Sequence, residues 1–129
     1  MIRAHSLGVP HRVAFTNGET TSVADVPKAK GGAGCGFGPH ELVEAALATC
    51  LTITVEMCAA EHGIPLESVE AEVRLDRSFH TEVRLIYSLA FRGAITEEQR
   101  NFLKAAAARC PVQRTLAGTI TCRDSTVRE

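Results

Sequence analysis

Five cysteines are the side chains of this sequence best suited to covalent chemistry. They lie at positions 35, 50, 58, 110 and 122 of the 129 residues. No two of them form a CxxC pair, which argues against zinc ribbons and thioredoxin-type motifs. Their odd number also argues against a secreted disulfide framework. We therefore expect any chemistry to come from a free thiol or from one switchable pair of thiols.

Cys110 has the local sequence of a reactive thiol. It immediately precedes Pro111, a residue that suits the first turn of a helix, and Arg109 and Arg114 flank it. The positive end of a helix dipole and nearby cations both stabilise a thiolate. Local reasoning therefore predicts that Cys110 is the more acidic thiol. The alternative is a cysteine that only packs at a helix kink.

Cys50 lies on the apolar face of a predicted long helix. A position in the middle of a helix gains nothing from the dipole, so a reactive Cys50 needs a nearby cation or hydrogen-bond donor. The alternative is a small core residue, because free cysteine is often buried. Cys50 and Cys110 can form a disulfide only if their Cα atoms lie within roughly 7 Å.

The other three cysteines are less suited to covalent chemistry. Cys35 lies in a glycine-rich loop and is expected to be exposed, whereas Cys58 and Cys122 are expected to pack. No HExxH motif or paired-carboxylate spacing is present, so a metal site has weak support.

Alternation of apolar and polar residues predicts the strands. Residues 11–26 read as a hairpin with its turn at Asn17-Gly18. Residues 69–75 and 83–91 alternate strictly, which predicts two antiparallel strands with one wet face. A short last strand is predicted for residues 118–123.

A long helix is predicted to start near Pro39 and to end at Gly63 and Pro65. It carries no charge between Glu44 and Glu56, and a helix that is apolar on all sides is buried. Three- and four-residue spacing gives it an inner face made of Val43, Leu47, Cys50, Ile53, Thr54 and Met57.

A second helix is predicted to open with a capping box at Thr96. Its inner face consists of Phe102, Leu103, Ala106, Ala107 and Cys110. Pro111 disfavours helical geometry at Cys110, so the helix should break there before a short helix at residues 112–117.

The net charge and the distribution of apolar residues argue against several classes of protein. The formal net charge is -1 without a long run of either sign, which argues against nucleic-acid binding. The N-terminus lacks the apolar core of a signal peptide. The longest uncharged apolar run, residues 45–55, is shorter than the roughly 20 residues that a membrane span needs. We expect a cytoplasmic protein without a membrane partner.

The order of elements predicts an α+β fold in one domain, residues 1–129. One small sheet cannot fully cover the central helix. A homodimer could bury the remainder.

Two segments resemble the OsmC/Ohr family of thiol-dependent peroxide-handling proteins. The first, GPHELVEAALATCLTITVEMCAAEHGIPLESVEAEV, is similar to the family's central-helix segment with its first cysteine. The second, ITEEQRNFLKAAAARCPVQRTLAG, is similar to the segment in which Cys-Pro opens a short helix. Together they lie within residues 38–118, in the family's order and with two strands between them.

The resemblance implies a fold in which antiparallel sheets wrap two central helices in an intertwined homodimer, with the active sites at the subunit interface. It also implies reduction of organic hydroperoxides. Cys50 attacks the peroxide as a thiolate and becomes a sulfenic acid, and Cys110 then closes a disulfide with it. No cofactor is bound, and an external dithiol, commonly a lipoylated protein, restores both thiols. The family's assignment of the attack to Cys50 stands against the local preference for Cys110.

The family's hydroperoxide enzymes also use an Arg from the N-terminal strands and a Glu near the start of the central helix. Arg12 is the best match for the Arg. His40 occupies the usual place of the Glu, ten residues before Cys50, and Glu41 is the substitute. The alternative for Glu41 is a plain partner of the helix dipole.

Two further functions stay open. One is a binding or stress protein of the same fold with little or no peroxide turnover. The other, a weaker one, is a thioesterase of the hot-dog type, whose acidic catalytic residue is not clearly placed in this sequence.

Overall fold

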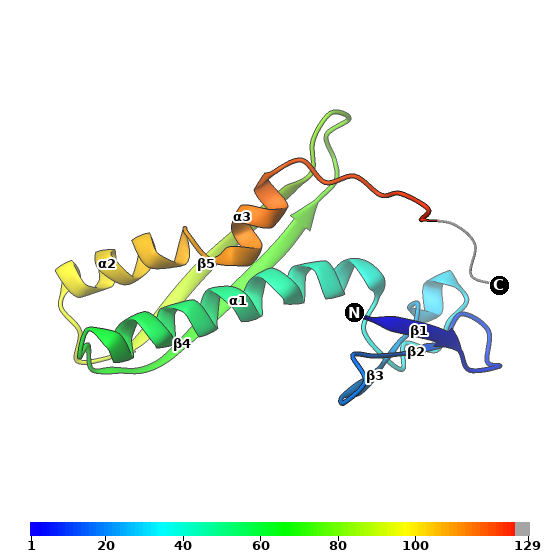
Figure 1. The fold of residues 1–129 in the computed structure, drawn as a ribbon, viewed down its shortest axis with the longest axis horizontal. Coiled ribbons are helices and arrows are strands. Elements are labelled where there is room, and N and C mark those ends of the chain that lie inside the picture. Colours follow the sequence, from blue (N-terminus) through cyan, green and yellow to red (C-terminus); the bar gives the residue numbers. More distant parts are fainter. Residues whose placement is uncertain (126–129) are drawn as a thin grey trace.

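The structure is a computed structural model and describes residues 1–125. It contains antiparallel sheets and helices, which confirms the predicted α+β class. Figure 1 shows helices α1, α2 and α3 over one face of the β4–β5 pair, with the N-terminal sheet at the start of α1. The elements in chain order are β1 (Arg3–Ser6), β2 (Val13–Thr16), β3 (Thr21–Ala24), the 3-10 helix η1 (Lys28–Lys30), α1 (Pro39–Glu61), β4 (Leu66–Asp76), β5 (Arg84–Gly93), α2 (Glu97–Ala107) and α3 (Pro111–Ala117).

The N-terminal sheet has the order β1-β2-β3 and is antiparallel throughout. The predicted hairpin is confirmed, although its loop spans residues 17–20 rather than two residues. Asn17 Oδ1 accepts hydrogen bonds from the backbone N–H groups of Glu19 and Thr20, at 2.9 and 2.8 Å, and thereby closes the loop. Strand β1 was not predicted, because all four of its residues are exposed and it lacks an apolar alternation.

β4 and β5 form a long antiparallel ribbon in which Val73 pairs with Tyr87 and Leu75 with Leu85. Exposure alternates along both strands, as predicted, and the half-buried side chains pack against the core. The predicted start of this second strand at residue 83 is wrong, because β5 begins at Arg84. Val83 precedes β5 and is 59% exposed, because it belongs to the connection between the strands.

α1 starts with Gly38 as its N-cap and Pro39 in its first turn. Only one face of it is buried within the chain, made of Leu47, Leu51, Val55 and Ala59. The prediction of burial on all sides is therefore wrong for the single chain, and Ile53 and Met57 are 55% and 59% exposed. The reason is that β4, α2 and α3 approach α1 from one side.

By length and composition alone, α1 could span a membrane, since its most apolar stretch has a mean hydropathy of 1.6. The uncharged run at residues 45–55 is only part of α1, so its length did not predict that the whole helix is long and apolar enough to span a membrane. The buried face of α1 packs against β4 and α2, which is the arrangement of a core helix.

α2 begins with the predicted capping box. The Gln99 backbone N–H donates to Thr96 Oγ1 at 3.1 Å, and the Thr96 N–H donates to Gln99 Oε1 at 2.9 Å. Leu103, Ala106 and Ala107 are buried as predicted. Phe102 was wrongly placed on the inner face: it is 43% exposed and its ring packs edge-on against that of His62.

The chain leaves helical geometry after α2 and resumes it in α3. Cys110 is extended, with φ −61° and ψ 147°, as the following proline requires. The predicted strand at residues 118–123 is wrong. That segment has no regular structure, and no strand of residues 1–125 pairs with it.

Candidate active site

The packing of α3 against α1 brings Cys50 and Cys110 together. Cys110 is fully buried, with 0% of its surface exposed, whereas Cys50 is half-buried. Both thiols are free, and each shifts the pKa of the other. Two residues that are 60 positions apart in sequence thus form one thiol pair.

The pKa of the Cys50 thiol lies below its ordinary value. Burial acts to raise it, but three hydrogen-bond donors outweigh burial: the backbone N–H of Val112, the Cys110 thiol and the Thr54 hydroxyl. The Thr54 oxygen lies 4.0 Å from the Cys50 sulfur. Hydrogen bonds to the charged form favour a thiolate on Cys50.

The pKa of the Cys110 thiol is raised, first by burial and then by its hydrogen bond to Cys50 and the charge there. The backbone N–H of Gln113, 3.3 Å from the Cys110 sulfur, offsets part of this rise. The local prediction that Cys110 is the more acidic thiol is therefore wrong. The N-terminus of α3 also directs the Val112 N–H to Cys50, which sequence reasoning could not show.

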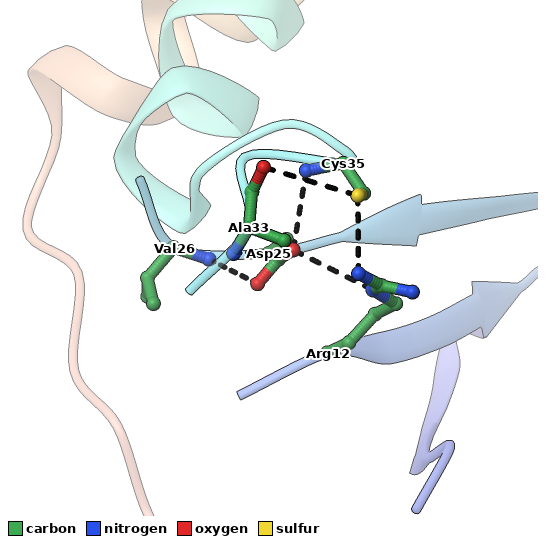
Figure 2. A network of polar contacts seen from close by, with 5 residues as sticks. All are labelled: Arg12, Asp25, Val26, Ala33 and Cys35. Carbon is green, nitrogen blue, oxygen red and sulfur yellow. Dashed lines mark hydrogen bonds and ion pairs between the residues drawn. The ribbon is translucent and has the colours of Figure 1, made fainter. Parts of the chain in front are cut away.

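Arg12 lies in a separate polar cluster in the N-terminal part of the chain (Figure 2). Its Nη2 donates to the Cys35 sulfur at 3.0 Å, and its Nε lies 3.5 Å from Asp25 Oδ2. Arg12 is not among the groups that shift the pKa of Cys50. Within one chain, the structure does not bring the predicted arginine to the predicted nucleophile.

Asp25 organises this cluster. Its side chain is 1% exposed and accepts hydrogen bonds from the backbone N–H groups of Val26, Ala33 and Cys35. The Cys35 N–H is the largest cause that lowers the pKa of the Asp25 carboxyl, and Arg12 adds to it. Cys35 itself is exposed, as predicted.

Glu41 caps α1. Its Oε1 accepts a hydrogen bond from the Gly38 N–H at 2.8 Å, and both Glu41 and His40 are exposed. Glu41 precedes Cys50 by nine residues, which is about 13 Å along a helix at 1.5 Å per residue. Within one chain Glu41 therefore acts at the helix start and away from the thiol pair.

The remaining cysteines lie outside the thiol pair. Cys58 is half-buried and burial raises its pKa, in agreement with a packing role. Cys122 is exposed, so its predicted packing role is wrong. The predicted strand that would have buried it is not formed.

A pocket of about 210 Å³ is lined by residues of α1, β5 and α3, and among residues 1–125 its wall includes neither Cys50 nor Cys110. α1 contributes Leu47, which lies one turn before Cys50, and α3 contributes Gln113, whose backbone N–H contacts Cys110. The wall is completed by Val83, Leu85, Tyr87, Leu116 and Ala117. Sequence reasoning missed this pocket, because nothing in the local sequence shows that β5 and α3 face one another across it.

The sequence model of one protein family, described as "OsmC-like protein", matches residues 30–123. The chain belongs to the OsmC-like family. The predicted resemblance is thereby confirmed, and the match includes both Cys50 and Cys110. No curated protein matches the chain significantly.

Solved structures share the OsmC fold of this chain. An OsmC-like protein from Mycoplasma pneumoniae has a TM-score of 0.76 and 22% identity, and the match covers 92% of this chain and 86% of that one. An organic hydroperoxide resistance protein from Legionella pneumophila has a TM-score of 0.63 and 26% identity, over 92% and 88%. The organic hydroperoxide resistance protein OhrB of Bacillus subtilis has a TM-score of 0.61 and 23% identity, over 92% and 90%.

Proposed function

We propose that this OsmC-like protein reduces organic hydroperoxides, with Cys50 as the nucleophile and Cys110 as the resolving thiol. The observation that carries the proposal is the packing of α3 on α1, which places Cys50 against the buried cluster that contains Cys110. In this pair the pKa of Cys50 is lowered and that of Cys110 is raised. A low-pKa thiolate attacks, and a neighbouring protonated thiol is suited to resolve the product.

The reaction balances with groups of this chain and one external reductant. The Cys50 thiolate attacks the terminal peroxide oxygen, the O–O bond breaks, and the alkoxide takes up a proton and leaves as an alcohol. Cys50 is then a sulfenic acid. The Cys110 sulfur attacks the Cys50 sulfur, an S–S bond forms and water leaves. An external dithiol, such as a protein-bound lipoyl group, gives two electrons and two protons to restore both thiols.

We propose that this pocket receives the organic group of the peroxide, because Leu47 and Gln113 in its wall each lie three residues along the chain from one of the two thiols. An apolar cavity of about 150 Å³ is large enough for benzene. The volume of about 210 Å³ therefore suits a phenyl or short branched alkyl group. Leu47, Leu85 and Leu116 supply its apolar wall.

We also propose that the protein acts as a homodimer. Ile53 and Met57 lie one turn apart on the exposed side of α1, and a second copy would remove this apolar surface from water. Any catalytic role of Arg12 or Glu41 then requires the Cys50 of the second copy, because within one chain neither residue is among the groups that shift the pKa of Cys50.

The dimer is tested by charge substitution. Ile53→Glu with Met57→Glu should convert a dimer into a monomer by sedimentation at low micromolar concentration. Ile86→Glu is the matched control, since Ile86 is 45% exposed on the outer face of β5. A wild-type monomer, or a double variant that stays dimeric, refutes the interface.

A binding or stress protein without turnover is the second candidate. The contacts of Arg12 with Asp25 and Cys35 favour it, because they occupy the guanidinium that peroxide activation is expected to use. Arg12→Gln separates the two functions. A large loss of peroxide turnover in Arg12→Gln relative to the wild type supports the enzyme. A wild-type protein that shows no peroxide turnover with a dithiol supports the binding protein.

The peroxidase proposal is tested by trapping its intermediates. Cys50→Ser should abolish consumption of cumene hydroperoxide. Cys110→Ser should consume one equivalent and leave a sulfenic acid on Cys50 that a dimedone-type probe labels. Oxidised wild-type protein should yield a Cys50–Cys110 disulfide by peptide mapping. A label on Cys110, or a disulfide through Cys35 or Cys58, would overturn the assignment.

A further inference from the structure

The hydroxyl of Thr54 has a different kind of partner from the other threonine hydroxyls of α1. Threonine within a helix usually donates to a backbone carbonyl three or four residues earlier. Thr49 Oγ1 donates to the Ala45 carbonyl at 2.7 Å, and Thr52 Oγ1 donates to the Thr49 carbonyl at 2.9 Å. Among residues 1–125, the hydroxyl of Thr54 has one hydrogen-bond contact, the Cys50 sulfur at 4.0 Å. This hydroxyl is therefore directed at the thiol and not at the helix backbone.

Helix geometry keeps the two side chains together. Residues four positions apart lie on the same face of a helix, so Thr54 stands one turn after Cys50. Both side chains are half-buried. A distance of 4.0 Å is long for a bond to the sulfur itself. An O–H···O hydrogen bond needs roughly 2.5–3.0 Å, so an oxygen atom attached to the sulfur on this side comes within reach of the hydroxyl.

We propose that Thr54 is a further catalytic residue, whose hydroxyl donates to the oxygen of the Cys50 sulfenic acid while Cys110 displaces that oxygen. This inference rests on the proposed peroxidase function, since it concerns the second step of that reaction. As the Cys110 sulfur attacks the Cys50 sulfur, the S–S bond forms and the S–O bond breaks. The oxygen leaves with the bonding electrons as hydroxide and takes up the proton of the Cys110 thiol, which gives water.

The hydroxyl contributes most where negative charge develops. The departing oxygen gains charge in the transition state, and a donor already aimed at it lowers the barrier. Thr54 keeps its own proton throughout. In the resting thiol pair its effect is small, because the Val112 N–H and the Cys110 thiol each lower the pKa of Cys50 more than Thr54 does. Loss of the hydroxyl should therefore slow disulfide closure more than it changes the acidity of Cys50.

Thr54→Val tests the inference, because valine has the shape of threonine without the hydroxyl. After oxidation by cumene hydroperoxide, timed trapping with a dimedone-type probe measures how fast the Cys50 sulfenic acid becomes the disulfide. Closure should be slower than in the wild type by roughly 2- to 12-fold, the range that one net hydrogen bond supplies. Thr54→Ser, which has a hydroxyl, should restore closure towards the wild-type rate. Thr52→Val is the matched control and should close like the wild type, since its hydroxyl bonds to the backbone.

A second measurement distinguishes catalysis from a change in packing. Dithiodipyridine converts Cys50 into a mixed disulfide, and Cys110 then displaces a thiopyridone, so the same S–S bond forms without an oxygen leaving. Thr54→Val should close this mixed disulfide at the wild-type rate. Equal slowing of both closures would overturn the proposal in favour of a structural role. Equal closure of the sulfenic acid in Thr54→Val and the wild type would overturn it outright.

The oxidant separates this inference from the peroxidase proposal. If cumene hydroperoxide leaves Cys50 of the wild type unoxidised, the proposed function fails. An excess of hydrogen peroxide then supplies the sulfenic acid, and closure is compared among the same variants. Slower closure in Thr54→Val alone keeps the role of Thr54 without organic hydroperoxide reduction. A wild-type Cys50 that forms no sulfenic acid with either oxidant overturns both proposals.

Discussion

The hydrogen bond from Cys110 to Cys50 leads to a prediction about the acidity of Cys50. Cys110→Ala removes the thiol that donates to the Cys50 sulfur, while Val112 N–H and Thr54 remain. One net hydrogen bond contributes about 0.5–1.5 kcal/mol, which corresponds to a roughly 2- to 12-fold change in an equilibrium. Below its pKa, the thiolate fraction of Cys50 should fall by this factor.

Cys110→Ser is the matched variant. Its hydroxyl can donate to the Cys50 sulfur as the thiol does, and it can also accept from the Gln113 N–H as the N-cap of α3. Cys110→Ser should therefore keep most of the acidity that Cys110→Ala loses. Both variants lack the second thiol, so differences between them cannot arise from disulfide formation with Cys110.

The assay is the pH dependence of iodoacetamide alkylation, quantified on the Cys50 peptide by mass spectrometry. The midpoint should move to higher pH in Cys110→Ala and stay near the wild-type position in Cys110→Ser. Thermal unfolding of each variant checks that α3 is still folded. Equal midpoints in the alanine and serine variants, both folded, would refute the reasoning that Cys110 acts as a donor.

Three further predictions concern stability. Thr96→Ala should lower the free energy of unfolding by about 1 kcal/mol and the Tm by roughly 3–5 °C, because α2 loses its cap, whereas Thr96→Ser should keep both near the wild-type values. Equal melting curves for Thr96→Ala and the wild type would contradict the capping role. Leu51→Ala should lower the free energy of unfolding, measured with urea, by about 2–5 kcal/mol, because Leu51 is 0% exposed. A decrease under about 1 kcal/mol would show that this face of α1 is not part of the core. The folded-state pKa of Asp25 is lowered, so its stabilisation is complete above the unfolded pKa and is lost as pH falls through the folded one. Asp25→Asn should lower the unfolding midpoint at neutral pH and flatten its acid dependence as the pH falls below about 4, and an unchanged acid limb would exclude the carboxyl as its source.

The sequence by itself determined the elements whose signals are local. Pro39 after Gly38, the Thr96 capping box and the proline after Cys110 each fixed a helix boundary through the backbone of neighbouring residues. Period-two alternation gave β4 and β5 their inner faces. The two cysteine segments were enough to suggest the family, because they keep a specific order and spacing.

Contacts between distant segments were decided only by the tertiary structure. The acidity of the two thiols could not be ranked from sequence, since the Val112 N–H that lowers the pKa of Cys50 comes from another helix. Arg12 matched a pattern by type and region, but its neighbours Asp25 and Cys35 depend on how the loop after β3 folds back. The pocket wall likewise joins Leu85 and Tyr87 of β5 to Leu116 of α3, which lie far apart in the sequence.

The same distinction explains the errors in burial. Apolar residues on every side of α1 predicted burial on every side, but a periodic pattern does not say how many neighbours the chain itself supplies. β4, α2 and α3 cover one face, and Ile53 and Met57 stay exposed. Likewise, residues 118–123 have strand-like composition without a strand beside them, and a ladder forms only where a second edge lies within hydrogen-bonding distance. Local sequence sets what a segment prefers, whereas the packing of distant segments sets which of those preferences is realised.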